Sequence, residues 1–413
     1  MIPRLKKCWI IALIVTFLGG CLDNEPLTPP LFICISERMS SSRKEIHRKI
    51  LVCDMTGKAR ATSIGEELHL SWDWFIPPTF AVQLLPMNRF FYNTVDGVYE
   101  YDILRDTKLL IIPPEQGKGG VVDFYLFENN ENMLLIRHWQ PIKKLILRNM
   151  QTGEEDLLIE GKQGYNLHRN PVSPSGRFLW VRDYNRKSRK YILRFFDREL
   201  KREILNIEST ECFSIGWNPW GARDNFYVSR SNGSRWEALE VNLPLRTTRS
   251  IGDQLSNCTT PCSWNDNIVV VESNPKESRV AVYDASGDLQ MHLPQVSSRC
   301  FNPITFPAED FILYASDEGG NQKTLLFKEG MKTPVTLAET IDPRPDYNEK
   351  ENLLLLCEIE HIDYAELKPD ELKVVYPYGM KAVDRPAKVY VINLKDFSRK
   401  EVFDDSLLAF WVR

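Results

Sequence analysis

Residues 171–183 read PVSPSGRFLWVRD, and this stretch decides the fold. A short turn, Pro174 to Arg177, leads directly into the apolar run Phe178 to Val181. Proline, serine and glycine favour tight turns, and aromatic and β-branched residues favour strands. The stretch therefore predicts a turn that enters a buried β-strand.

The same order of turn and strand recurs along the chain. We call these turns the slot turns, and they begin at Pro86, Asn129, Pro174, Pro219, Trp264, Pro307 and Pro369. The steps are 43, 45, 45, 45, 43 and 62 residues. A short apolar segment precedes each turn, and further strands such as RVAVYDA follow it. Four short antiparallel strands in roughly 40–50 residues are typical of a β-propeller blade. The sequence therefore predicts an all-β propeller with very little helix.

The two ends of the chain predict how the ring closes. The apolar segment Leu407 to Val412 resembles the segments that precede slot turns, and no such segment precedes the first unit at Leu31. We expect the C-terminal strand to complete the N-terminal blade, which would hide both sheet edges. Counting this shared blade gives a single propeller of eight four-stranded blades. We place an insertion near residues 342–360, in the long step, and it leaves seven blades as the alternative.

One unit resembles a known repeat. The stretch Asn170 to Asp183 resembles the SPDG-type blade repeat of TolB-type propellers, and Phe311 to Gly320 is similar to its second half. Ser175 stands where the repeat usually has Asp, and Trp220 interrupts the turn at Pro219. The same repeats occur in the non-catalytic propellers of prolyl-oligopeptidase-like enzymes. The resemblance implies a binding platform and brings no catalytic residues with it.

The N-terminus predicts export and lipid attachment. Three basic residues precede the apolar run Cys8 to Leu18, which is shorter than the roughly 20 residues that span a bilayer. The run ends in LGGC, which resembles the bacterial lipobox, and this resemblance implies acylation of Cys21. We predict a signal peptide over residues 1–20, a lipid-anchored tether over 21–30 and the propeller over 31–413. The alternative is a secreted protein cut near Gly20.

These features predict a location in the bacterial cell envelope. The protein would be held to a membrane through its lipid anchor, on the periplasmic or the outer face. Leu22 follows the cysteine, so no inner-membrane retention signal of the enterobacterial kind is present. Charged residues are 26% and the formal net charge is -4, a balance that favours no nucleic-acid partner.

The chain lacks the linear motifs of common enzymes. It has no G-x-S-x-G, no HExxH, no Walker loop and no G-x-G-x-x-G. It has six histidines and no CxxC pair, so we expect neither a metal nor a cofactor. Cys258 and Cys262 could close a small loop as a disulfide. The alternative role for the cysteines is that of small buried hydrophobic residues, as expected for Cys34, Cys53 and Cys357.

Candidate binding residues lie at the expected mouth of the central channel. They are the polar residues just before the slot turns and near the insertion: His168, Arg169, Arg299, His361 and Asp363. The alternative is a solvated or ion-paired channel lining. Two charged stretches, the basic residues 182–202 and the acidic residues 346–371, would polarise the surface if they lie on opposite sides of the ring.

We therefore expect a monomeric, non-enzymatic scaffold that docks an envelope protein or an extended peptide. The alternative is a propeller enzyme, a lyase or hydrolase that acts on polysaccharide or peptide at the channel mouth. His168, His361, Arg299 and Asp363 would then supply general acid–base and anion-binding groups.

Acylation at Cys21 can be tested directly. Cells that express the full chain should incorporate labelled palmitate into the protein, and Cys21→Ser should abolish the label because no other residue stands at the lipobox position. Equal labelling of both proteins, or of neither, would contradict the lipoprotein assignment.

Overall fold

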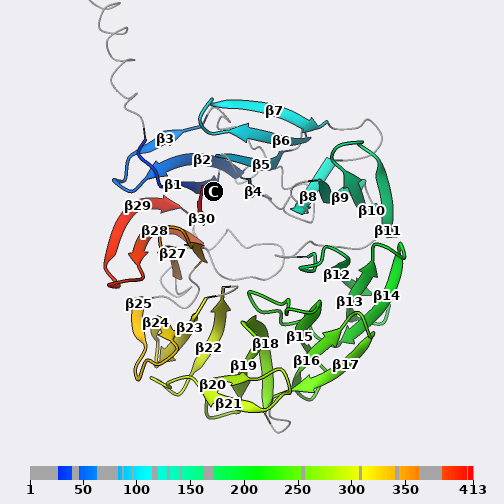
Figure 1. Cartoon of the computed structure of the whole chain (residues 1–413), viewed down its shortest axis with the longest axis vertical. Coiled ribbons are helices and arrows are strands. Elements are labelled where there is room, and N and C mark those ends of the chain that lie inside the picture. The colour runs from blue at the N-terminus through cyan, green and yellow to red at the C-terminus, as the bar shows by residue number, and fades with distance from the viewer. Residues whose placement is uncertain are drawn as a thin grey trace, which may run out of the picture.

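The computed structural model is a ring of eight antiparallel β-sheets (Figure 1). It describes residues 27–39, 46–62, 82–85, 88–94, 97–113, 120–127, 131–139, 142–161, 171–185, 187–252, 256–306, 309–339, 344–361, 384–406 and 408–412. These residues contain no helix, and so none that could cross a membrane. The sheets are the blades of a β-propeller, as predicted, and are numbered 1 to 8 in chain order.

The first four blades follow one another along the chain. Blade 1 contains β1 (Leu31–Met39), β2 (Ile46–Asp54), β3 (Ala59–Ala61) and β30 (Leu408–Trp411). Blade 2 contains β4 (Val82–Leu85), β5 (Arg89–Thr94), β6 (Gly97–Asp102) and β7 (Thr107–Ile112). Blade 3 contains β8 (Gly120–Phe127), β9 (Asn132–Trp139), β10 (Ile142–Asn149) and β11 (Glu155–Gly161). Blade 4 contains β12 (Phe178–Asn185), β13 (Lys190–Asp197) and β14 (Arg202–Ser209).

The other four blades complete the ring. Blade 5 contains β15 (Asn225–Ser231), β16 (Trp236–Asn242) and β17 (Thr247–Ile251). Blade 6 contains β18 (Asn257–Trp264), β19 (Asn267–Ser273), β20 (Ser278–Tyr283) and β21 (Leu289–His292). Blade 7 contains β22 (Cys300–Thr305), β23 (Phe311–Glu318), β24 (Asn321–Lys328) and β25 (Val335–Ala338). Blade 8 contains β26 (Arg344–Asn348), β27 (Leu353–His361), β28 (Asp384–Asn393) and β29 (Arg399–Ser406).

The inner position of blades 4 and 5 is filled by irregular segments. Val172 forms an isolated bridge to Leu179 in blade 4, and Trp220 forms one to Phe226 in blade 5. Pro171 and Pro174 lie in the first segment and Pro219 in the second, and proline cannot donate to a ladder. Each segment still takes the place of the first strand of a four-stranded blade.

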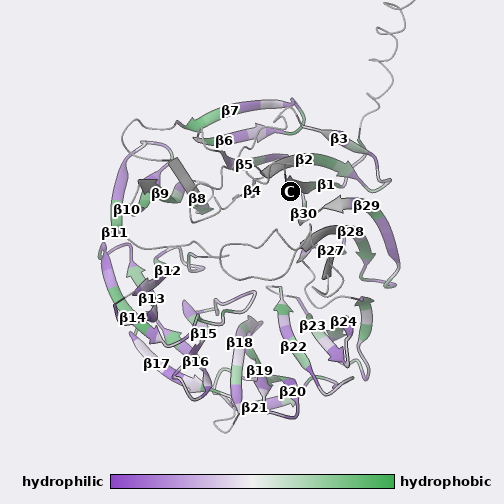
Figure 2. Ribbon diagram, turned by 180° about the vertical axis from the view of Figure 1, so that it is seen from behind, coloured by the Kyte–Doolittle hydropathy of each residue, from purple (hydrophilic) through white to green (hydrophobic). Residues whose placement is uncertain are grey.

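The middle strands are apolar because each blade is covered by a neighbour on both faces. In β12 the first four residues are all buried. Trp180 packs at a centroid distance of 5.1 Å on Phe226 of blade 5, while Leu179 belongs to a cluster with Leu134 of blade 3. The outer strand β17 of blade 5 is exposed and polar, and Figure 2 shows it in purple beside the more apolar inner strands.

In seven of the eight blades the turn between the third and fourth strands contains the same kind of hydrogen bond. We call these turns the Asx turns, because a side-chain oxygen of Asp or Asn at the end of the third strand accepts a main-chain N–H two or three residues later. These residues are Asp54, Asp102, Asn149, Asp197, Asn242, Asp284 and Asn393. The recurring Asp or Asn is a second periodic signal in the sequence, which the slot turns alone do not predict.

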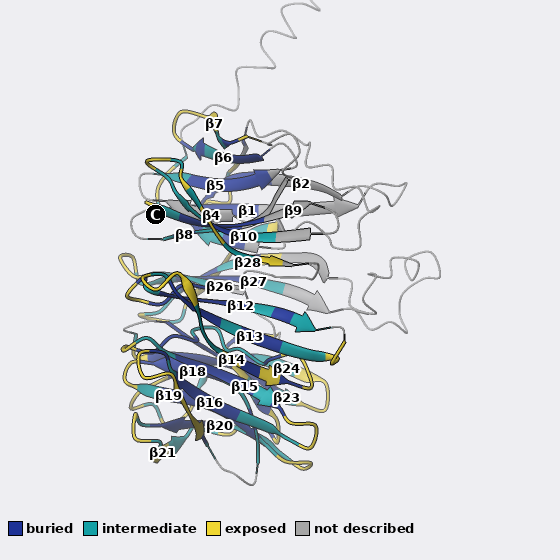
Figure 3. Cartoon of the chain, turned by 90° about the vertical axis from the view of Figure 1, so that its right-hand side faces the viewer, coloured by how far each residue is buried: buried dark blue, intermediate teal, exposed yellow. Residues whose placement is uncertain are grey.

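The antiparallel order places the connections on two faces of the ring. The slot turns and the Asx turns share one face, which we call the slot face. The hairpins between second and third strands and the links between blades share the other, which we call the linker face. Figure 3 shows exposed turns gathered along the slot face, the side that carries the C-terminus.

The ring closes as predicted. β30 pairs with β1 in register, with Phe32 opposite Trp411. The main-chain N–H of Trp411 donates to the Asp346 carboxylate at 2.8 Å, and its indole N–H donates to the Asp346 main-chain oxygen at 3.1 Å. One residue therefore joins the last strand to blades 1 and 8.

The predicted position of the insertion is wrong. Residues 344–361, close to the segment assigned to the insertion, form β26 and β27. The slot turn of blade 8 therefore lies between these strands, where Asn352 has a positive φ of 53° and donates its N–H to the oxygen of Glu349 at 3.3 Å. Pro369, the predicted start of this slot turn, lies outside the described residues. The extra residues are 362–383, between β27 and β28.

Truncation of the closing tryptophan should destabilise the whole ring. Trp411 is fully buried against Phe32, so Trp411→Ala should lower the free energy of unfolding by about 3–5 kcal/mol. Trp236→Ala is the matched control, because Trp236 is only half-buried. Urea unfolding followed by circular dichroism measures both. Equal losses in the two variants would argue against a special role of the closure.

Candidate functional site

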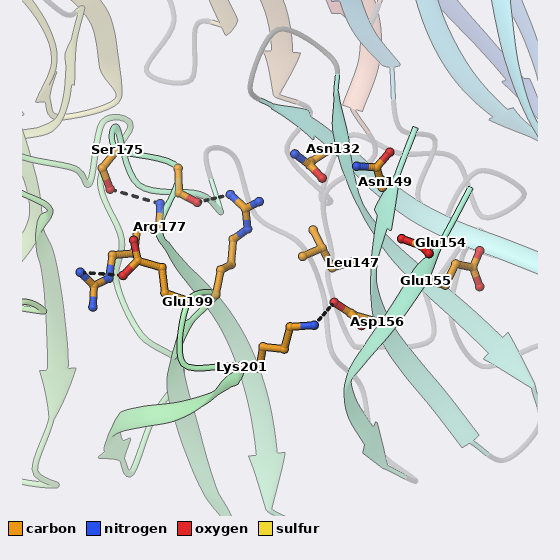
Figure 4. Close-up of a pocket in the computed structure, with 12 residues that line it drawn as sticks. Asn132, Leu147, Asn149, Glu154, Glu155, Asp156, Ser175, Arg177, Glu199 and Lys201 are labelled. Carbon is orange, nitrogen blue, oxygen red and sulfur yellow. Dashed lines mark hydrogen bonds and ion pairs between the residues drawn. The ribbon is translucent and has the colours of Figure 1, made fainter. Parts of the chain in front are cut away.

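Two hollows meet on the slot face. The rim hollow, of about 790 Å³, lies between blades 3 and 4 (Figure 4). The mouth hollow, of about 550 Å³, lies at the inner ends of blades 3 to 6. Ser175 and Gly176 line both. The two hollows therefore lie on either side of the same turn, and we refer to them together as the depression.

The shared wall is the slot turn of blade 4. The N–H of Gly176 donates to the oxygen of Ser173 at 2.8 Å, and the N–H of Arg177 donates to the Ser175 hydroxyl at 3.1 Å. Gly176 has a φ of 76°, which favours glycine. The Ser175 N–H donates to Asp224 of blade 5 at 3.2 Å. Ser175 thus makes the turn contact of an Asx residue, and the turn is fixed to the next blade.

An ion pair between the partly exposed Arg177 and the buried Asp197 lies beside the rim hollow. Arg177 donates to Asp197 through Nε at 3.1 Å and Nη2 at 2.7 Å. The carboxylate of Asp197 is 1% exposed and also accepts the N–H groups of Glu199 and Leu200. Burial alone would raise the pKa of Asp197, but these hydrogen bonds outweigh burial and hold it below the usual value.

Arg198 ties the shared wall to blade 3. Its guanidinium donates to the oxygen of Gly176 at 2.5 Å and lies 4.8 Å from the ring centre of Phe127. This places a cation over an aromatic face, a favourable arrangement. The two hollows are therefore separated by a wall that both blades hold in place.

The outer wall of the rim hollow is acidic. Glu154, Glu155 and Asp156 of blade 3 line one side of the hollow, and Lys201 of blade 4 reaches toward Asp156 in Figure 4. Lys201 crosses the hollow to Asp156 at 2.9 Å, and both side chains are more than half exposed. Such an exposed pair contributes little stability, so a ligand can exchange it at small cost.

The mouth hollow is more apolar. Tyr125, Phe127 and Trp220 line it together with small residues such as Gly221 and Ala222. Burial raises the pKa of Tyr125, so its hydroxyl is neutral at physiological pH. In the described part of both hollows no histidine is present, and the Ser173 and Ser175 hydroxyls contact each other at 3.1 Å. The depression can supply charge pairing at the rim and apolar contact near the centre.

The candidates from the sequence lie elsewhere or outside the described residues. Arg299, just before β22, and His361, at the end of β27, are both on the linker face. Arg299 is exposed, and its main-chain oxygen accepts from Asp317 at 3.0 Å. His168, Arg169 and Asp363 lie outside the described residues, as does Cys21. The structure therefore brings neither Arg299 nor His361 to the depression on the slot face.

The expected disulfide between Cys258 and Cys262 is not formed. Both lie in β18, but Cys258 packs in a cluster with Ile251 of blade 5, whereas Cys262 packs in a cluster with Tyr314 of blade 7. A register shift between Thr259 and Cys262 separates them further. The alternative role as buried hydrophobic residues fits both.

The two charged stretches lie in opposite blades. The basic residues 182–202 belong to blade 4, and the described part of the acidic stretch belongs to blade 8. Much of the basic charge is paired inside its own blade, for example Arg194 with Asp183 at 3.2 Å and with Glu203 at 2.8 Å. Internal pairing weakens the field that the sequence alone suggests.

Comparison with known proteins places the chain in no family. No family model matches it, and no curated protein matches it. Three solved structures show distant similarity. A puromycin-hydrolyzing peptidase of Mycobacterium tuberculosis has 12% identity and a TM-score of 0.49, covering 78% of this chain and 58% of the peptidase. The β-propeller domain of the Trilobed protease of Pyrococcus furiosus has 10% identity and a TM-score of 0.44, covering 91% and 96%. An oligogalacturonate lyase in complex with manganese has 8% identity and a TM-score of 0.48, covering 79% and 93%. These similarities carry no argument about function.

The rim-hollow residues were not predicted from the sequence. Glu154 to Asp156 and Arg198 to Lys201 follow the Asx residues of two consecutive blades. Aligning the chain on its Asx residues, about one repeat apart, would have placed these two charged turns side by side. An alignment on the slot turns alone does not bring these two charged turns together.

The Arg177–Asp197 pair should make stability depend on pH. Since the pKa of Asp197 is lower in the folded chain, its contribution is complete above about pH 4 and is lost as pH falls through the lowered value. Asp197→Asn should cost about 1–3 kcal/mol at pH 7 and flatten the loss of stability in acid. Urea midpoints between pH 2.5 and 7 measure this.

The matched control is Asp284→Asn. Asp284 accepts the same kind of turn hydrogen bonds but is partly exposed and has no arginine partner in the described contacts. Equal changes in both variants would mean that the turn, rather than the ion pair, carries the effect.

Proposed function

We propose that the protein is a membrane-tethered, non-enzymatic propeller lipoprotein of the bacterial envelope that docks an extended segment of an envelope protein. The observation that carries this proposal is the position of the rim hollow and the mouth hollow on either side of one turn, Ser175 and Gly176, on the slot face. Their volumes are in the range of sites that enclose ligand groups. A chain segment can enter at the rim and extend toward the centre.

The chemistry of the two ends supports a peptide ligand. At the rim, the acidic Glu154 and the basic Lys201 are exposed. Glu154 can pair with a positive group of the ligand, and Lys201 can pair with a negative group. At the centre, Phe127 and Trp220 can receive an apolar side chain. The rigid slot turn between them keeps the two ends in a fixed relation, which reduces the entropic cost of binding.

The membrane tether supports an envelope partner. Acylation at Cys21 would hold the propeller at a bilayer, which raises the effective concentration of any membrane-bound partner.

Photocrosslinking can test the docking site. A photoreactive residue in place of Glu154 should give an adduct with one envelope protein, whereas the same residue in place of Lys276 should not. Lys276 is exposed on the linker face, in the β19–β20 hairpin. Lys201→Glu should lower the yield of the Glu154 adduct roughly tenfold, because it sets a like charge against Asp156.

Lys276→Glu is the matched control, since it makes the same charge change on the other face. Equal yields at both positions would contradict the site. Absence of any adduct, together with turnover of a polysaccharide or peptide library by the purified protein, would replace the scaffold by the enzyme alternative.

A further inference from the structure

The described chain begins on the slot face. Leu27 packs on the cluster between blades 1 and 2, which includes Leu31 and Phe90. The N–H of Thr28 donates to the carboxylate of Asp54 at 3.3 Å. Asp54 is the Asx residue of blade 1, so its turn lies on the slot face. Any tether that precedes Leu27 therefore leaves from this side of the ring.

The tether is short compared with the height of the ring. Five residues, 22–26, separate Cys21 from Leu27. A fully extended chain covers at most about 20 Å over this distance. A strand of eight residues such as β12 is about 26 Å long. The tether therefore cannot pass from the slot face around the rim to a membrane that lies against the linker face.

Three exposed leucines stand at the tips of Asx turns on the slot face. Leu104 of blade 2 is 67% exposed, Leu200 of blade 4 is 43% exposed, and Leu245 of blade 5 is 71% exposed. Exposed side chains of this size are normally scattered singly over a surface. Three of the eight exposed large apolar residues of the described chain thus occupy equivalent turns on the slot face. The other five lie on outer strands or in a link between blades: Leu109, Leu110, Leu157, Leu289 and Val296.

Each leucine is followed by a cation. The pairs are Leu104–Arg105, Leu200–Lys201 and Leu245–Arg246. The Arg105 side chain is 80% exposed and lies 3.6 Å from Asp102, and Lys201 is 70% exposed and contacts Asp156. A leucine beside a basic group suits the interface of an anionic bilayer. The leucine side chain enters the acyl boundary, and the basic group contacts the headgroups.

We infer that the propeller stands with its slot face toward the bilayer and that these leucine tips contact it. The inference rests on the lipid anchor of the proposed function. It also defines the partner, because the depression on the slot face then opens toward the membrane. The docked segment would belong to a membrane-inserted protein and would lie close to the lipid surface.

The exposed thiol of the protein provides a control on the opposite face. Cys212 lies in the link between β14 and blade 5, on the linker face, and it is the one exposed cysteine among the described residues. A fluorophore on Cys212 reports the linker face. In a Cys212→Ser background, Leu245→Cys and Leu104→Cys place the same fluorophore on the slot face, at exposed positions that should tolerate it.

The test uses the full acylated chain reconstituted into vesicles of phosphatidylglycerol and phosphatidylethanolamine that carry spin-labelled lipid. We expect severalfold stronger quenching by the spin-labelled lipid at residues 104 and 245 than at Cys212. Stronger quenching at Cys212, equal quenching at all three positions, or none at any position would overturn the orientation. Thermal melting of each labelled variant confirms that it is folded.

The palmitate assay separates this inference from the proposed function. If Cys21 carries no lipid, the anchor itself fails. If Cys21 is acylated and the fluorophores at residues 104 and 245 remain in water, the anchor stands and only the orientation fails.

Discussion

The structure depends on one constraint: each blade has two apolar faces, and a neighbour must cover both. A row of such sheets would leave an uncovered face at each end, and a ring removes both ends. The constraint explains why the middle strands are apolar on both faces, as in β12, and why closure occurs through a strand that the chain supplies last. Trp411 joins β30 to β1 and to Asp346 of blade 8. The pairing of β30 therefore completes the sheet of blade 1 and brings it against blade 8 at the same time.

Much of the fold follows from local signals in the sequence. A turn and the strand after it are set by residues close in the chain, so the strands that follow the slot turns from Pro86 to Pro307, and the closing strand, were predicted correctly. Blade 8 was misplaced because Pro369 imitates a slot turn, whereas the turn before β27 uses Asn352 with a positive φ. Asparagine in the left-handed region is a weaker sequence signal than a proline.

The candidate site could not be predicted in the same way. Its walls are made by residues about 45 positions apart, such as Asp156 with Lys201 and Ser175 with Asp224. No local pattern reports which side chains of two blades meet across their seam. The same limit applies to Cys258 and Cys262, whose spacing suggested a bond although their side chains pack in clusters shared with different neighbouring blades.

The Asx turns have a consequence for variation between related chains. The hydrogen bonds of each turn centre on one residue at its base, and in blade 4 the tip residues Glu199 and Leu200 contact Asp197 through their main-chain N–H groups. The tip side chains can therefore change without loss of the turn. One face of such a ring therefore carries turns whose tip side chains can change independently in each blade. New surfaces can arise in this way while the sheets beneath stay the same.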